Sequence, residues 1–148
     1  MTAVLETKVE TRRLILPRQA NTSGTAHGGT LLKWMEQVAA MSAMRCAGTD
    51  VVTVGMDGAR FHHPIPQGRI ALIDAYTYEV GTSSLQVRVR GYDEDPTTGD
   101  TDLATEAFVV MAALDEDGAT TEVAPLGVES DRGRRLRREA VAGREGEG

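Results

Sequence analysis

Cysteine, lysine and long apolar runs are all scarce in this sequence. The 148 residues include one cysteine, Cys46, which excludes an intrachain disulfide framework and a cysteine-rich metal site. Cys46 lies in an apolar segment and is expected to be a small buried core residue. No run approaches the roughly 20 apolar residues that cross a bilayer, and the N-terminus lacks the layout of a signal peptide. We therefore expect a cytoplasmic protein without a membrane partner.

Positive charge is also in short supply. The 22 acidic residues outnumber the 16 basic ones, which gives a formal net charge of -6. This balance argues against an extended phosphate-neutralising surface, so no nucleic-acid partner is expected. The length suits a single domain. Residues 127–148 have almost no large apolar side chains to offset their ordering entropy, so we expect one domain over 1–126 followed by a flexible charged tail.

One segment has the pattern of a long amphipathic helix. From Thr30 onward, apolar positions recur at three- and four-residue steps, as in a helix buried on a broad face. These positions are Leu31, Leu32, Met35, Val38, Ala39 and Ser42 or Ala43. Gly48 is expected to end the helix, because glycine adopts the left-handed cap conformation without steric cost.

The remaining pattern predicts strands. Residues 7–16 precede the helix, and four segments rich in β-branched, aromatic or alternating residues follow it: 51–61, 69–80, 84–92 and 103–115. Segment 84–92 alternates most regularly, with Leu85, Val87 and Val89 on one face and Gln86, Arg88 and Arg90 on the other. The fold class is therefore α+β. One helix covers only part of a five-stranded antiparallel sheet, so the sheet must curl around it or pair with a second sheet, and an oligomer is expected.

Two glycines, Gly28 and Gly29, open the predicted helix. The first N–H groups of a helix lack intrahelical partners and lie at the positive end of its dipole, so they can donate to a carbonyl oxygen that gains charge. Glycine leaves the approach to these groups unobstructed. The alternative is that the pair only makes a tight turn into the helix.

One carboxylate, Glu36, lies among the apolar helix positions. It follows Gly29 by seven residues, so both lie on one helix face about 10 Å apart and could line one cleft. Apolar neighbours such as Leu32 and Ala39 are expected to desolvate the carboxylate partly and make it a better base. The alternative is a surface carboxylate paired with Lys33.

Other polar candidates lie near the helix start and after the second predicted strand. Asn21 precedes a turn, where asparagine commonly bonds its own backbone, although its amide could instead hold a water or a substrate carbonyl. His27, beside the glycine pair, is a candidate acid-base or substrate-binding group. The pair His62 and His63 has no third ligand at a plausible spacing, so no metal site is expected.

The segment "NTSGTAHGGTLLKWMEQVAAMSA" resembles the helix-start motif of the hotdog-fold acyl-CoA thioesterases, in the cytosolic acyl-CoA hydrolase branch that includes brain-type and bacterial broad-specificity enzymes. The resemblance continues through "VTVGMDGARFHHPIPQGRIALIDAYTYEVGTSSLQVRVRGYDED" and "LATEAFVVMAALDEDG" and covers about residues 7–126. The joint occurrence of Asn-x-x-Gly-x-x-His-Gly-Gly, the helix acid, Phe-x-x-Pro and Gly-x-Ser-Ser is more specific than any one of them.

The resemblance implies a hotdog fold, a five-stranded antiparallel sheet wrapped around one long central helix. It implies dimers that join their sheets edge to edge, and a homohexamer formed as a trimer of dimers. The active site would be composite, with Asn21 of one protomer facing Glu36 of the other. No cofactor or metal is implied.

The activity implied is hydrolysis of acyl-CoA to a fatty acid and CoA. The N–H groups of Gly28 and Gly29 would polarise the thioester carbonyl, Glu36 would activate water or attack as a nucleophile, and Asn21 would position the water or the carbonyl. The turn of Gly81, Thr82, Ser83 and Ser84 would lie near the nucleotide and pantetheine end of CoA. Arg60 or Arg88 could meet a phosphate, with ordinary surface solvation as the alternative.

The chain departs from the family pattern at one position, because many members carry Asp where it has Glu36. The extra methylene moves the carboxylate by about 1 Å, a shift that can affect the rate strongly. Two alternatives to a thioesterase are therefore a protein that binds acyl-CoA or CoA without turnover and, less favoured by its spacing, an enoyl-CoA hydratase or dehydratase that uses His27 with Glu36.

Overall fold

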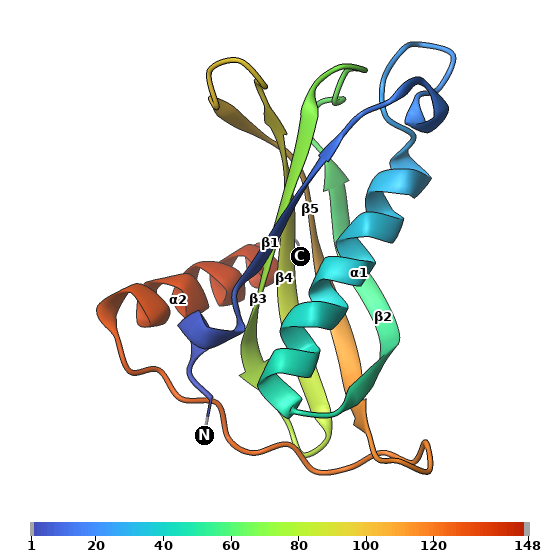
Figure 1. Ribbon diagram of the computed structural model, residues 1–148. Coiled ribbons are helices and arrows are strands. Elements are labelled where there is room, and N and C mark those ends of the chain that lie inside the picture. Colours follow the sequence, from blue (N-terminus) through green and yellow to red (C-terminus); the bar gives the residue numbers. More distant parts are fainter. Residues whose placement is uncertain (1, 147–148) are drawn as a thin grey trace.

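The structure is a computed structural model that describes residues 2–146. Its strands form one antiparallel sheet in the order β1-β3-β4-β5-β2 (Figure 1). The strands are β1 (Val9–Leu14), β2 (Asp50–Phe61), β3 (Ile70–Val80), β4 (Ser84–Glu94) and β5 (Thr101–Leu114). The predicted α+β order of one strand, a long helix and four further strands is thereby confirmed, and short 3-10 helices at Val4–Thr7 and Pro17–Gln19 flank β1.

Helix α1 (Gly28–Ala47) lies along one face of the sheet, which curves around it (Figure 1). Its buried side chains face the sheet and are Leu31, Trp34, Met35, Val38, Ala39, Ser42, Ala43 and Cys46. The single cysteine is buried in the core, as expected, and burial raises the pKa of its thiol. Gly48 ends the helix with φ of 71°, and its N–H donates to the carbonyl of Met44 at 2.8 Å. The start, face and end predicted for this helix are therefore confirmed.

The sheet face toward α1 is almost entirely apolar. Leu85, Val87 and Val89 of β4 are fully buried there, while Arg88 and Arg90 of the same strand point to the opposite face, as the alternation predicted. The opposite, outer face carries ion pairs instead, with Arg88 joined to Glu106 at 2.6 Å. The two faces of the sheet therefore differ, one apolar and packed on α1 and the other lined with charged side chains.

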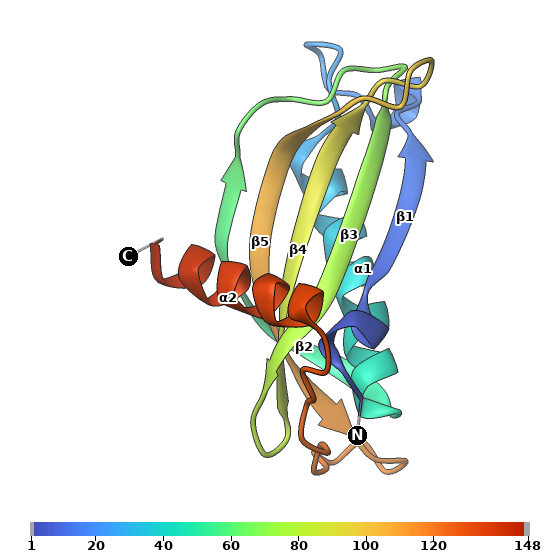
Figure 2. The ribbon, with the colours of Figure 1, turned by 90° about the vertical axis from the view of Figure 1, so that its left-hand side faces the viewer.

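Most of the segment expected to be a flexible tail, residues 127–148, is helical in the structure. Residues Asp131–Gly146 form a second helix, α2, which crosses β3, β4 and β5 on the outer face of the sheet (Figure 2). Leu136 and Ala140 are buried with Val4, Tyr76 and Phe108. The small side chains of the helix let its backbone approach these rings, so few large apolar residues are needed. Residues 147 and 148 of the expected tail lie outside the described residues.

Polar contacts complete the attachment of α2. The hydroxyl of Tyr76 donates to the carbonyl of Leu136 at 2.7 Å, and Arg144 donates to the amide oxygen of Gln86 at 2.5 Å. Arg144 also lies over the ring of Tyr78, 5.5 Å from its centroid. Within residues 2–146, no helix has the length and apolar character that crossing a membrane requires.

Candidate active site

The start of α1 leaves several backbone donors open. His27 occupies the N-cap position without a side-chain cap, and the first helical hydrogen bond runs from the N–H of Leu31 to the carbonyl of His27 at 3.1 Å. A Cβ at Gly28 would lie 3.5 Å from the ring of Phe61, an ordinary contact, and one at Gly29 would meet nothing within 4 Å. Neither close packing nor a positive φ requires glycine at these two positions. The glycine pair is therefore better explained by open access to the N–H groups than by a steric need for a tight turn.

A cavity of about 340 Å³ lies beside this helix start. It is lined by Asn21, Thr25, Ala26, Gly28, Leu31, Phe61, His62, His63 and Pro64. The structure thus brings together two of the predicted site residues, Asn21 and Gly28, although they are separated by a turn. The two histidines next to Phe61 join them, and His63 lies 3.8 Å from Asp93. Among residues 2–146 no group of three or more potential ligand side chains could hold a metal ion.

The side chain of Asn21 both stabilises the turn and keeps a donor group. Its Oδ1 accepts hydrogen bonds from the N–H of Ser23 at 2.9 Å and the N–H of Thr25 at 3.1 Å, as in the predicted turn. Because these bonds occupy the oxygen, the NH₂ group is the part that can reach a ligand, and it has no acceptor within residues 2–146. This geometry is suited to donation toward a carbonyl oxygen or a water.

Glu36 lies outside this cavity. It is exposed on α1, eight residues from Gly28 and therefore about 12 Å further along the helix. Within the described residues it pairs neither with Lys33 nor with another cation. The expected desolvation by Leu32 and Ala39 is absent in the single chain, because Leu32 is itself partly exposed and Ala39 faces the sheet. One protomer by itself therefore does not bring Asn21 and Glu36 into one pocket.

His27 and Arg60 also remain outside the cavity. His27 is exposed at the helix start and, like Asn21, does not share a pocket with Glu36 in the single chain. Arg60 is exposed on β2, where its carbonyl accepts a hydrogen bond from Thr105 at 2.7 Å.

The Arg88 guanidinium is committed to the outer face of the sheet. Burial by itself would lower the pKa of Arg88, but hydrogen bonds and charge interactions with Tyr76 and Glu106 outweigh it and raise that pKa. Neither expected role, phosphate contact or surface solvation, fits a side chain in this position.

The turn from Gly81 to Ser84 lies at the opposite end of α1 from the Asn21 cavity. Its backbone is closed by a hydrogen bond from the N–H of Gly81 to the carbonyl of Ser84 at 2.9 Å. A Cβ at Gly81 would lie only 2.5 Å from Oγ of Ser84, so the tight turn itself requires this glycine. The carbonyls of Thr82 and Ser83 are also engaged, with the N–H groups of Val123 and Ala113.

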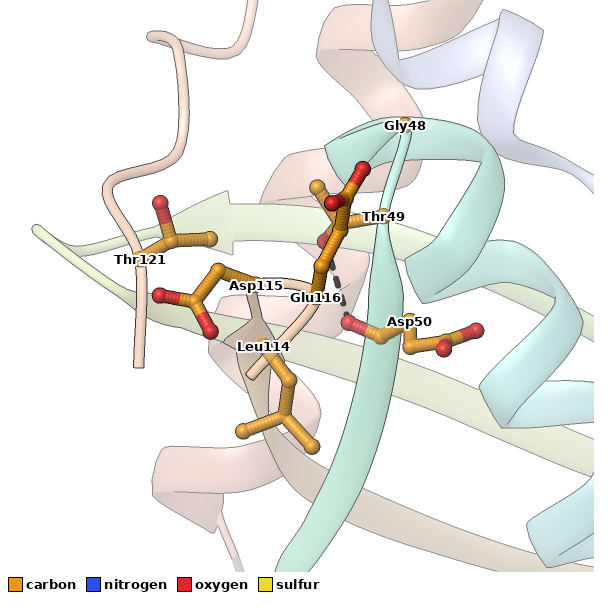
Figure 3. A pocket seen from close by; sticks show the side chains of 7 residues that line it. All are labelled: Gly48, Thr49, Asp50, Leu114, Asp115, Glu116 and Thr121. Carbon is orange, nitrogen blue, oxygen red and sulfur yellow. Dashed lines mark hydrogen bonds between the residues drawn. The ribbon is translucent and has the colours of Figure 1, made fainter. Parts of the chain in front are cut away.

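A further recess of about 310 Å³ lies near the C-terminal end of α1 (Figure 3). Its carboxylates belong to Asp50, Asp115 and Glu116, and the hydroxyl of Thr49 donates to the carbonyl of Asp50 at 3.0 Å. Asp115 also accepts backbone hydrogen bonds within its own turn. Because acids surround it, this recess is unsuited to an anionic ligand.

The profile of one family, the thioesterase superfamily, matches residues 23–99. The chain belongs to this superfamily. An uncharacterized acyl-CoA thioester hydrolase of Bacillus subtilis, YkhA, is 34% identical over 118 residues, which cover 80% of this chain and 69% of the relative. A solved hexameric acyl-CoA thioesterase matches with a TM-score of 0.87 at 30% identity and covers 98% of this chain and 93% of its own. The expected thioesterase fold is thereby confirmed.

The acyl-CoA hydrolase of Staphylococcus aureus, solved with butyryl-CoA, CoA and CoA disulfide, matches with a TM-score of 0.89 at 32% identity over 98% of this chain and 88% of its own. Solved variants of that protein replace an asparagine, an aspartate and a threonine by alanine. The aspartate follows the asparagine by 15 residues and precedes the threonine by 17. Asn21, Glu36 and Thr53 have the same separations in this chain.

Thr53 lies on β2, beside a break in register between Thr53 and Gly55, and is partly buried. No hydrogen bond of its hydroxyl is found within residues 2–146. Nothing in the sequence pattern singles it out, since a lone threonine in a strand is an ordinary β-former.

Proposed function

We propose that this thioesterase-superfamily protein hydrolyses acyl-CoA thioesters to a free carboxylic acid and CoA. The observation that carries the proposal is the start of α1, where Gly28 and Asn21 line one cavity and the N–H groups of Gly28 and the adjoining Gly29 are left open. Such donors stabilise the oxygen of a thioester carbonyl as it gains negative charge. Relatives and structural neighbours named as acyl-CoA hydrolases support this chemistry.

In the proposed reaction a water molecule attacks the thioester carbonyl carbon. Glu36 takes a proton from that water, the carbonyl oxygen is held by the N–H groups of Gly28 and Gly29, and Asn21 orients the water or the carbonyl. The C–S bond then breaks, and the CoA sulfur leaves as a thiolate that takes up a proton. The acid and CoA are the products, and no cofactor takes part in the proposed steps.

The proposed site is shared between two protomers. Asn21 and Glu36 do not line one pocket in the single chain, and β2 has one side that pairs with no strand of residues 2–146. Exposed apolar side chains gather on this strand and on α1, among them Val52 at 47%, Val54 at 65% and Met41 at 41% exposed. An unpaired edge strand with apolar side chains is a template for pairing, and a second copy would cover it.

The match in residue separations adds Thr53 to the proposed site. Its hydroxyl would hold the attacking water beside Glu36, and so compensate for the reach of a carboxylate one methylene longer than Asp.

We also propose that three such dimers form a hexamer, because solved structural neighbours are hexameric. We propose a cytoplasmic location as well, which the name of a human cytosolic relative supports.

Release of free thiol from a panel of acyl-CoAs tests the activity. Wild-type protein should release CoA, Glu36→Gln should lose about a hundredfold or more in kcat, and Glu36→Asp should keep measurable turnover because it retains the base. Lys33→Gln, on the same exposed helix face, serves as the matched control. If the wild type binds CoA but releases no thiol at any chain length, the protein is a binding protein and the proposal fails.

Mixing two inactive variants tests the shared site. Asn21→Ala and Glu36→Gln chains, co-expressed with different tags, would form mixed dimers in which one of the two sites has both residues intact. Random pairing should then restore about a quarter of wild-type activity, whereas residues that act within one protomer would restore none. Activity that stays at the level of the separate variants would contradict the composite site.

A further inference from the structure

A second cavity lies between the β3–β4 turn and α2. Its volume is about 390 Å³, and it is lined by Val80, Gly81, Thr82, Glu122, Val123, Pro125, Leu126 and Arg137. The hydrogen bond from the N–H of Val123 to the carbonyl of Thr82, 2.8 Å long, holds its two walls together. The cavity therefore combines an apolar wall, a hairpin turn and two charged side chains, Glu122 and Arg137.

Arg137 differs from the arginines that attach α2 to the sheet or stabilise its first turn. Arg144 bonds Gln86, and Arg134 pairs with Asp131, whereas Arg137 has neither an ion pair nor a hydrogen bond within residues 2–146. Glu122 also lines the cavity but does not form an ion pair with it. A guanidinium in such a place presents a planar set of donors that matches phosphate oxygens.

The charge of α2 adds to this preference. Residues 131–146 contain six arginines and three carboxylates, in a chain whose formal net charge is -6. An anion approaching this end of the molecule is thus attracted to α2 and repelled by the recess around Asp50, Asp115 and Glu116. Of the exposed arginines of α2, Arg137 is the one that lines the cavity at the β3–β4 turn.

We propose that Arg137 binds the phosphate groups of the CoA nucleotide and so sets the preference for CoA thioesters over thioesters without a nucleotide. This inference rests on the proposed hydrolase function. From Glu36 the helix continues eleven residues to Ala47, about 17 Å, toward the end where the β3–β4 turn lies. An extended pantetheine arm spans a comparable distance, and the partly exposed apolar side chain of Leu126 suits the face of an adenine ring.

Arg137 lies outside residues 7–126, over which the family resemblance extends, and outside the matched range 23–99. The proposed contact therefore rests on the position of Arg137 in this structure, and it makes α2 a recognition element as well as a cover for the sheet.

The test compares acyl-CoA with the same acyl group on pantetheine, which lacks the nucleotide. Arg137→Gln should raise KM for acyl-CoA about fivefold, with kcat little changed, and leave KM for acyl-pantetheine unchanged. Arg135→Gln, on the same helix and exposed but away from the cavity, is the matched control and should change neither value. Arg137→Lys should retain part of the affinity, because it keeps the charge but not the fork of donors.

Equal changes for the two substrates, or equal changes in Arg137→Gln and Arg135→Gln, would overturn the role of Arg137. Calorimetric binding of CoA separates this result from failure of the proposed function. If the wild type hydrolyses nothing but its affinity for CoA still falls about fivefold in Arg137→Gln alone, the hydrolase proposal fails and the phosphate contact stands.

Discussion

Helices α1 and α2 pack on opposite faces of one sheet, and they are attached in different ways. Helix α1 buries eight of its 20 residues against an apolar face, and its contacts extend to every strand. Helix α2 buries Leu136 and Ala140 against aromatic rings and uses polar bonds at Tyr76 and Arg144 for the rest. The comparison shows that a helix rich in charge can dock where the partner surface supplies the large side chains.

The difference has an energetic consequence. Apolar burial along the whole of α1 makes its packing inseparable from the formation of the core, while α2 rests on one leucine, small residues and a few polar contacts. Local elements with few buried apolar contacts open at lower free energy than the core does. We therefore expect α1 to unfold with the sheet and α2 to detach first.

The largest expected effect comes from a substitution that creates a cavity beneath α1. Met35 is fully buried, and Met35→Ala should lower the free energy of unfolding by about 3 kcal/mol. Urea unfolding followed by the fluorescence of Trp34, the one tryptophan and itself on α1, measures this loss. Lys33→Ala, exposed on the same helix, should change stability by no more than about 0.5 kcal/mol. Similar losses in the two variants would contradict the assignment of α1 to the core.

A similar truncation in α2 should act locally. Leu136→Ala should weaken attachment of α2 by about 2 kcal/mol and speed tryptic cleavage at its exposed arginines, while the Trp34 unfolding transition stays close to that of the wild type. Leu136→Met, which conserves volume, is the control and should leave cleavage nearly unchanged. If Leu136→Ala shifted the Trp34 transition as far as Met35→Ala does, α2 would belong to the core and the contrast between the helices would be lost.

The hydroxyl of Tyr76 allows a finer test. Tyr76→Phe removes the hydrogen bond to the carbonyl of Leu136 and the one from Arg88 at 3.2 Å, and should cost about 1 kcal/mol because both partners stay buried. Amide hydrogen exchange in α2, read by mass spectrometry, should become about fivefold faster. The control is Tyr92→Phe on the same sheet face, whose hydroxyl makes no hydrogen bond within residues 2–146. An unchanged amide exchange rate in Tyr76→Phe would show that apolar packing, without the Tyr76 hydrogen bonds, holds α2 on the sheet.

Salt should give the smallest effect. Arg144 lies 3.8 Å from Glu79 at a partly exposed position, and such pairs contribute less than about 1 kcal/mol and are screened by ions. Raising the salt concentration should therefore speed exchange in α2 about twofold and leave α1 unchanged, and Arg144→Gln should remove part of this salt dependence. Equal salt effects on both helices would show that the polar contacts are not what sets α2 apart.

Periodicity explains why α1 was predictable and α2 was not. The steps from Leu31 to Ala43 mark a broad apolar face, whereas Leu136 and Ala140 make a stripe too narrow to distinguish from a solvated segment. The binding surface for α2 is assembled from Tyr76 and Phe108, which lie far apart in the chain, so local sequence could not show it.

The candidate site also has some features that local sequence predicts and others that depend on tertiary structure. The turn at Asn21 and the open start of α1 follow from local patterns and are present in the structure. The cavity that joins Asn21 to Phe61 and His62 depends on the approach of β2, and the exposure of Glu36 depends on which helix face the sheet covers. Thr53 is a candidate only because its separations from Asn21 and Glu36 match those in the Staphylococcus aureus hydrolase. A threonine in a strand by itself predicts no function.

The sequence alone determined the order of elements, the buried face of α1 and the alternation of β4, because these depend on residues a few positions apart along the chain. Tertiary structure decided the rest: the docking of α2, the ion pairing of Arg88 and the placement of Arg137 in a cavity beside the β3–β4 turn. Each of these needs side chains from distant segments to meet, and the free energy that brings them together comes from burial of the whole sheet rather than from any local preference.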